Sequence, residues 1–88
     1  MSYDVIYNKS VQKYLEKMDT QVSLRITTWI EKNLAGCEDP RSVGKALRGK
    51  YTGAWRYRIG EYRVIVDIKD KELIIIVIDI GSRKNIYY

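Results

Sequence analysis

The sequence predicts an α+β fold of order β-α-α-β-β-β, with a helical hairpin packed on one face of a small, twisted, mostly antiparallel sheet. Three observations predict it. Apolar residues recur at helical spacing through residues 10–36, they alternate or run continuously in segments between residues 53 and 80, and a glycine–acid pair separates two of those segments. The chain has 88 residues, enough for one core, so we expect a single domain over residues 1–88.

The N-terminal part of the chain changes period near Ser10. Within residues 2–7, Tyr3, Val5 and Tyr7 fall at alternate positions on one side, which predicts a short strand. The spacing i, i+3, i+4, i+7 then predicts an amphipathic helix of about two turns. Asp19 or Thr20 can cap a second helix that ends near Gly36. The connection between the helices is minimal, so they should form an antiparallel pair.

The middle of the chain reads mainly as a loop, and two apolar strands follow it. Residues 37–53 contain Pro40 and three glycines without a sustained period, and so long a loop is often functional. The segment YRVIVDI predicts one strand. The near-continuous apolar segment ELIIIVIDI predicts a central strand covered on both faces, which Gly81 should break.

The segment GAWRYRIGEYR, residues 53–63, predicts a β-hairpin with Gly60–Glu61 at its tip, because Gly suits the first central position of a type II′ turn. A two-residue loop places Ile59 opposite Tyr62 and Arg58 opposite Arg63. The helices should cover the face that carries Tyr57, Ile59, Tyr62 and Val64. The large aromatic side chains are expected in the core rather than as base-stacking platforms: Tyr14, Trp29, Trp55, Tyr57 and Tyr62.

The other face of this hairpin collects positive charge. Arg56, Arg58 and Arg63 share it, and like charges opposite one another destabilise a strand pair unless an anionic ligand offsets them. Seven of the sixteen basic residues, but one of the eleven acidic residues, lie between positions 41 and 63 of a chain with net charge +5. Such a distribution favours a nucleic-acid partner over a merely solvated charged face. We expect nonspecific phosphate contacts from Lys45, Arg48 and Lys50.

Composition excludes several kinds of chemistry. The chain has no histidine and one cysteine, Cys37, which argues against a thiol protease or a zinc site. Its acidic residues are scattered and no Walker-type loop appears, so we expect no metal and no cofactor. Arginine, lysine and tyrosine would then have to carry any reaction, which suits RNA cleavage because the ribose 2′-hydroxyl is an internal nucleophile. Without a long apolar run or a signal peptide, the protein is expected to be soluble, cytoplasmic and not membrane-bound.

The segments KALRGKYTGAWRYRIGEYRVIVDI and VIDIGSRKNIYY resemble the RelE toxins of the RelE/ParE superfamily, and the similarity spans nearly the whole chain. These are the toxic halves of bacterial type II toxin–antitoxin modules. The resemblance implies a protein that enters the ribosomal A site and cuts mRNA through the 2′-hydroxyl without metal. It also implies a cognate antitoxin that wraps the toxin, and operator DNA bound by the pair through the antitoxin.

The resemblance also implies roles for individual residues. Arg56 and Arg58 would grip the phosphate backbone and assist proton transfer, and Arg63 would stabilise the transition-state phosphate. Arg83 would stabilise that phosphate or act as an acid, and Tyr87 would stack on a base or orient and deprotonate the nucleophile.

Two departures from the family pattern leave the general base open. Many relatives have histidine at the position of Ser82, and some have lysine at the position of Arg56. Tyr88 is an alternative to Tyr87. Two other functions stay open as well: a ParE-like inhibitor of DNA gyrase, and a noncatalytic nucleic-acid-binding module whose arginines only bind phosphate.

Overall fold

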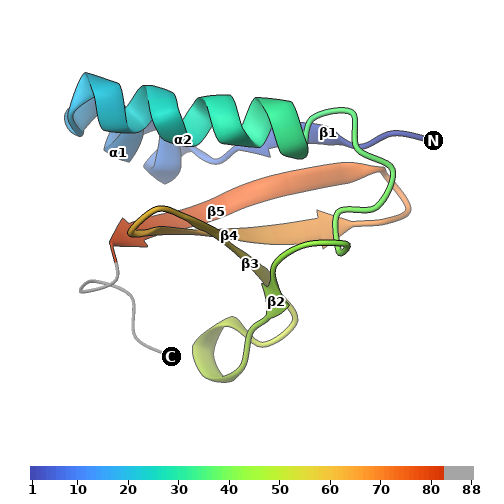
Figure 1. The fold of residues 1–88 in the computed structure, drawn as a ribbon. Coiled ribbons are helices and arrows are strands. Elements are labelled where there is room, and N and C mark those ends of the chain that lie inside the picture. Colours follow the sequence, from blue (N-terminus) through green and yellow to red (C-terminus); the bar gives the residue numbers. More distant parts are fainter. Residues whose placement is uncertain (83–88) are drawn as a thin grey trace.

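Two helices lie side by side over one face of a five-stranded sheet (Figure 1). The structure is a computed structural model, and it describes residues 1–82. Its elements in chain order are β1 (Asp4–Tyr7), α1 (Lys9–Lys17), α2 (Thr20–Asn33), β2 (Lys45–Ala46), the 3₁₀ turn η1 (Gly49–Tyr51), β3 (Trp55–Ile59), β4 (Tyr62–Lys69) and β5 (Ile74–Ser82). The predicted α+β class and the helical hairpin are confirmed, and β2 is an additional strand within the segment predicted as loop.

The strands follow the order β1-β5-β4-β3-β2, with β1 parallel to β5 and every other pair antiparallel. β5 is therefore central, as its apolar sequence predicts. The predicted break at Gly81 is wrong, because β5 continues to Ser82 with Gly81 opposite Arg63. A glycine weakens a strand but still offers its backbone groups to the ladder, so pairing with β4 carries the strand past it.

Side-chain caps explain where the helices begin. The Asn8 Oδ1 atom accepts a hydrogen bond from the Val11 amide at 2.9 Å, which starts α1. Asp19, not Thr20, caps α2, since its Oδ1 accepts from the Gln21 amide at 2.9 Å. Gly36, with φ of +79°, follows the end of α2 as a left-handed C-terminal residue. The predicted hairpin with its short connection follows from these signals.

The main core lies between α2 and the sheet face that carries Tyr57, Ile59 and Val64, as predicted. Ile26, Ile30 and Leu34 of α2 are at most 1% exposed within it. The Trp29 and Tyr57 rings meet with their centroids 5.6 Å apart. Tyr14 is a correction: it lies on the outer side of α1 and is 36% exposed, because Val11 and Leu15 already fill the inward stripe of this short helix.

A second, smaller cluster lies on the opposite sheet face. Leu47 and Ile65 are buried there, with Tyr51, Ala54 and Ile78 packed against them. The segment 47–54 therefore covers part of the face that the helices leave open. In Figure 1 the turn η1 lies on the far side of the sheet from the helices.

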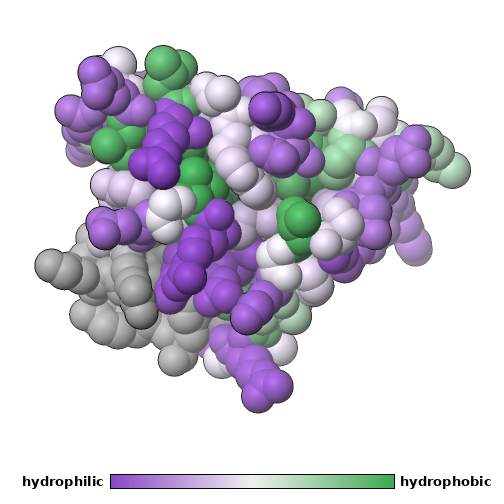
Figure 2. Space-filling view, viewed as in Figure 1, coloured by the Kyte–Doolittle hydropathy of each residue, from purple (hydrophilic) through white to green (hydrophobic). Residues whose placement is uncertain are grey.

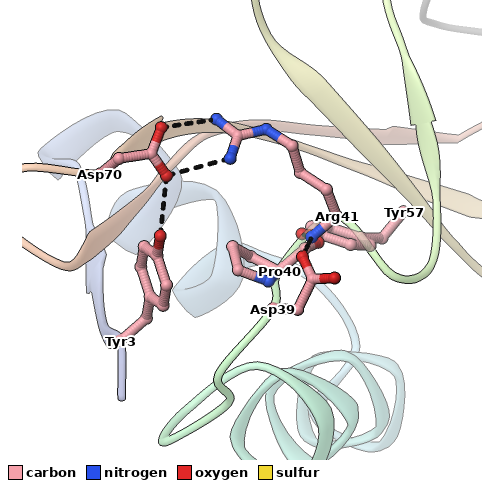
Figure 3. Close-up of polar contacts among 6 residues, drawn as sticks. All are labelled: Tyr3, Asp39, Pro40, Arg41, Tyr57 and Asp70. Carbon is pink, nitrogen blue, oxygen red and sulfur yellow. Dashed lines mark hydrogen bonds and ion pairs between the residues drawn. The ribbon is translucent and has the colours of Figure 1, made fainter. Parts of the chain in front are cut away.

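Polar contacts fix the start of the long loop (Figure 3). The Arg41 guanidinium donates two hydrogen bonds of 3.0 Å to the Asp70 carboxylate, which also accepts one of 2.7 Å from the Tyr3 hydroxyl. The Arg41 bond, and after it the Tyr3 bond, hold the pKa of Asp70 below its usual value. The Tyr57 hydroxyl donates to the Pro40 carbonyl. Pro40 and Arg41 are thus joined to β3 and to the β4–β5 turn before the chain reaches β2.

Among residues 1–82, no helix has the length and apolar character that crossing a bilayer requires.

Candidate nucleic-acid interface

The β3–β4 hairpin has the predicted register. Ile59 pairs with Tyr62, and Arg58 pairs with Arg63. Gly60 at the first central position of the turn has φ of +60°, whereas Glu61 keeps a negative φ. This combination is that of a type II′ turn, whose twist matches the flanking strands. The turn therefore determines which side chains share a face.

Four basic side chains lie on the sheet face opposite the helices. Arg56 and Arg58 alternate with the buried Tyr57 along β3, Arg63 is directly opposite Arg58, and Lys45 of β2 is directly opposite Arg56. Residues directly opposite one another share a face of a sheet. We call this group, Lys45, Arg56, Arg58 and Arg63, the basic face. Figure 2 shows hydrophilic side chains gathered beneath the helical layer.

The exposure of these cations differs. Lys45 and Arg58 are exposed, whereas Arg56 and Arg63 are partly buried. Arg58 and Arg63 line a cleft of about 140 Å³ together with Gly60 and Glu61 at the hairpin tip. Two guanidiniums around a cleft of this size can bind a phosphate through several charge-assisted hydrogen bonds.

A larger pocket, of about 370 Å³, opens at the edge of the sheet. Lys45, Arg56 and Arg58 contribute its basic wall, and Trp29 and Tyr57 its aromatic wall. The Trp55 indole Nε1 donates to the Val43 carbonyl at 2.7 Å, which holds the floor of the pocket against β3. The edge of the sheet therefore places positive charge beside the partly buried Trp29 ring, whereas the Tyr57 ring is covered. Positive charge beside an aromatic ring is a combination that suits nucleotides.

The other two predicted phosphate contacts belong to the segment 47–54, which packs on the same face of the sheet. Arg48 directly precedes η1 and Lys50 lies within it, and both are exposed. The Lys50 ammonium lies 5.5 Å from the centroid of the Tyr51 ring, within the range of a cation–π contact. We call Arg48 and Lys50 the basic rim. Arg83, Tyr87 and Tyr88 lie outside the described residues, so their predicted roles stay predictions.

No tyrosine with a perturbed pKa in the described part of the chain is poised as a base. Burial raises the pKa of Tyr57, and its hydroxyl is engaged with Pro40. Burial, followed by the charge of Glu31, raises the pKa of Tyr7 to about 12. The hydrogen bond to Asp70 raises the pKa of Tyr3. A phenolate near neutral pH needs the opposite shift, so Tyr3, Tyr7 and Tyr57 do not fit the role of a base.

Sequence reasoning missed the pair Tyr51 and Asp79. The Tyr51 hydroxyl donates to the Asp79 Oδ2 atom at 2.5 Å. Asp79 lies opposite Ile65 on the same open side of the sheet. The sequence offered one signal for Asp79, which is a lone carboxylate within an apolar stretch of the central strand. Tyr51 lies 28 positions away, outside any segment with a regular hydrophobic period, so the sequence did not indicate the contact.

The helical pair, the mixed sheet and the order of elements match the fold of solved RelE and RelBE structures. The sequence model described as "ParE toxin of type II toxin-antitoxin system, parDE" matches residues 5–87, and the chain belongs to this family. The resemblance derived from the sequence is confirmed at the level of the superfamily.

Individual relatives agree with this assignment. Toxin RelG of Mycobacterium tuberculosis is 25% identical over 87 residues, which cover 99% of this chain and 98% of RelG. The toxin–antitoxin complex RelBE2 from M. tuberculosis contains a chain similar to this one with a TM-score of 0.83 and 22% identity, over 97% of this chain and 95% of that one. The archaeal RelE–RelB complex from Pyrococcus horikoshii contains a chain similar to this one with a TM-score of 0.69 and 26% identity. The similarity covers 98% of this chain and 100% of that one.

Proposed function

We propose that this type II toxin is a ribosome-dependent mRNA endoribonuclease that cleaves through the RNA's own 2′-hydroxyl without a metal ion and so inhibits translation. The observation that carries the proposal is the register of the hairpin, which gathers Arg56, Arg58 and Arg63 on one sheet face. Lys45 extends this face to the edge of the sheet. The similarity to toxins named RelG and RelE adds support.

The chemistry follows from what guanidinium groups can do. The 2′-hydroxyl gives up its proton and its oxygen attacks the adjacent phosphorus. The bond from O2′ to phosphorus forms, the bond to the 5′-oxygen breaks, and that oxygen takes up a proton, which leaves a cyclic phosphate and a 5′-hydroxyl. Charge builds on the phosphoryl oxygens as this happens, and fixed guanidiniums stabilise it with donors already in place. Arg58 and Arg63 line one cleft and are the described residues best placed to bind a single phosphate.

The roles of the remaining residues are part of the proposal. Arg56 grips the backbone beside the scissile phosphate, and the basic rim binds flanking phosphates. Arg83 completes the charge around the transition state, and Tyr87 or Tyr88 orients or deprotonates the nucleophile. Arginine is too weak an acid to exchange protons readily, so in-line geometry imposed by the ribosome supplies much of the rate.

The proposed partners follow from the same relatives. We infer a cognate antitoxin, because the structures of RelBE2 and of the P. horikoshii RelE–RelB complex are toxin–antitoxin assemblies. The antitoxin would bind operator DNA and so bring the toxin–antitoxin complex to it. The mRNA in the ribosomal A site is the proposed substrate, which places the active protein in the cytoplasm.

The test compares growth arrest and mRNA cleavage after brief induction. We expect the wild type to produce discrete cuts within codons by primer extension. Arg63→Ala and Arg83→Ala should each reduce cleavage by about 10²- to 10³-fold, the usual effect of losing one transition-state donor. Lys13→Ala, which removes an exposed cation from α1, is the control and should behave as wild type. Undiminished arrest by both arginine variants contradicts the mechanism.

Inhibition of DNA gyrase is the second candidate, because the matching family is described by its ParE members. This function predicts DNA breaks with intact transcripts, and the same induction experiment distinguishes it. A noncatalytic binder predicts RNA that is bound but stays whole, even when ribosomes are present.

A further inference from the structure

A tyrosine–carboxylate hydrogen bond joins the loop to the centre of the open sheet face. Tyr51 donates to Asp79 at 2.5 Å. Asp79 lies opposite Ile65, and Ile65 lies opposite Arg56, so the three form a row across β5, β4 and β3. The register shifts directly after Ile65, which leaves Ile78 as an extra residue on β5. Such bulges often redirect side chains beside functional sites.

Tyr51 belongs to the same short segment as the basic rim. Lys50 precedes it and lies 5.5 Å above its ring, and Arg48 precedes the turn that contains both. Leu47, which is 7% exposed, anchors the start of this segment against Ile65. The segment therefore has an apolar anchor before Arg48 and a polar anchor after Lys50. The two rim cations lie between these anchors.

We propose that Tyr51 and Asp79 are positioning residues for RNA binding: their hydrogen bond holds the basic rim beside the basic face, so that one RNA strand contacts both. The identity of the ligand rests on the proposed function, whereas the positioning itself does not.

For the substitution Asp79→Ala, electrostatics alone and positioning predict opposite changes in RNA binding. Asp79 places a carboxylate among cations, so removing it should strengthen phosphate binding if electrostatics were its whole effect. Positioning predicts that Asp79→Ala weakens binding, because the Tyr51 hydroxyl loses its acceptor. Asp79→Asn removes the charge but keeps an acceptor oxygen, so it should bind RNA at least as tightly as the wild type.

The experiment measures binding of a fluorescein-labelled single-stranded RNA by the full-length protein, using fluorescence anisotropy. Tyr51→Phe and Asp79→Ala are each expected to weaken binding by about two- to tenfold, the usual range for one hydrogen bond. Tyr3→Phe is the matched control, since it removes a tyrosine–aspartate hydrogen bond far from the rim. In a protein that already carries Arg48→Ala and Lys50→Ala, Tyr51→Phe should have no further effect on binding.

A second readout is independent of RNA. Trypsin should cleave after Arg48 and Lys50 faster in Tyr51→Phe than in the wild type or Tyr3→Phe, with cleavage after Lys32 in α2 as the reference for global opening. Tighter RNA binding by Asp79→Ala overturns the inference, and so do unchanged cleavage rates in Tyr51→Phe. A wild type that binds no free RNA overturns the claim that the pair positions the rim for RNA binding by the isolated protein. It leaves the ribosome-dependent function to the induction experiment, and the trypsin cleavage rates then decide whether the pair positions the rim.

Discussion

The Tyr7 hydroxyl is buried without a hydrogen-bond partner among the described residues. Tyr7 lies at the end of β1 and packs against the main core. Its aromatic ring makes apolar contacts. Its buried hydroxyl has lost its hydrogen bonds to water, and no group among the described residues replaces them. This polar atom therefore reduces stability at a site where its ring increases it.

Tyr7→Phe is accordingly expected to leave the free energy of unfolding unchanged at pH 7, or to raise it by about 1 kcal/mol. Urea denaturation measures this. The folded pKa of about 12 exceeds the ordinary value of 10.0, so the folded state retains the phenol proton longer than the unfolded state. Ionisation of Tyr7 therefore leaves the free energy of unfolding unchanged below pH 10 and lowers it as the pH rises through about 12. The phenylalanine variant should lack this alkaline loss, and a large destabilisation at pH 7 would show that the hydroxyl is satisfied.

Prediction from the sequence was good at this scale wherever strand alternation applied. The alternation of Arg56, Tyr57 and Arg58 predicted which side chains face the helices, because successive residues of a strand point to opposite faces. The contact between Tyr51 and Asp79 was missed, because it joins a loop to a strand and depends on how the loop folds back.

At the scale of elements, the approach of β2 to β3 depends on Gly44. This residue has φ of +85°, and a Cβ added there would lie 2.4 Å from the Arg56 carbonyl oxygen and 2.7 Å from the Trp55 Nε1 atom. No side chain fits without moving the β3 backbone. The close approach brings Lys45 into register with Arg56.

Gly44→Ala should therefore destabilise the protein by about 2 to 4 kcal/mol, since backbone strain adds to a steric clash. Gly36→Ala is the matched control. It has a similar φ of +79° but nothing within 4 Å of the added Cβ, so it should cost only about 1 to 2 kcal/mol. Thermal or urea denaturation of both variants measures the difference. Equal costs would mean that the clash at Gly44 relaxes freely.

The pairing of β2 with β3 shows why the sequence did not predict β2. Lys45–Ala46 is too short for any period to be visible, and its pairing depends on a glycine whose role appears only beside β3. Gly81 misled in the opposite direction, because a glycine that usually ends a strand here lies in a strand whose pairing with β4 continues past it.

At the scale of the whole molecule, positive charge is concentrated on one side of the sheet. Arg58 and Arg63 oppose each other directly there, and a like-charge pair costs stability when no anion is bound. We therefore expect the charge that suits the protein for a polyanion to reduce the stability of the free fold.

Arg58→Thr is expected to raise the free energy of unfolding by about 0.2 to 1 kcal/mol at low salt, because it removes this repulsion and places a β-branched residue in β3. The gain should shrink at 1 M salt, where the Debye length is about 3 Å. The same variant should bind single-stranded RNA more weakly. Urea denaturation at two salt concentrations, paired with RNA binding, measures both changes. A variant that loses stability at low salt would show that Arg58 has a stabilising partner.

The parallel pairing of β1 with β5 has a consequence for synthesis of the chain. Residue 4 aligns with residue 74, so the first strand made must wait for β5, its one sheet neighbour within residues 1–82. Contacts so distant along the chain form late and slowly. The nascent polypeptide therefore cannot complete this sheet until β5 has been translated, and a product truncated before β5 would lack the central strand against which the arginine-bearing hairpin is built.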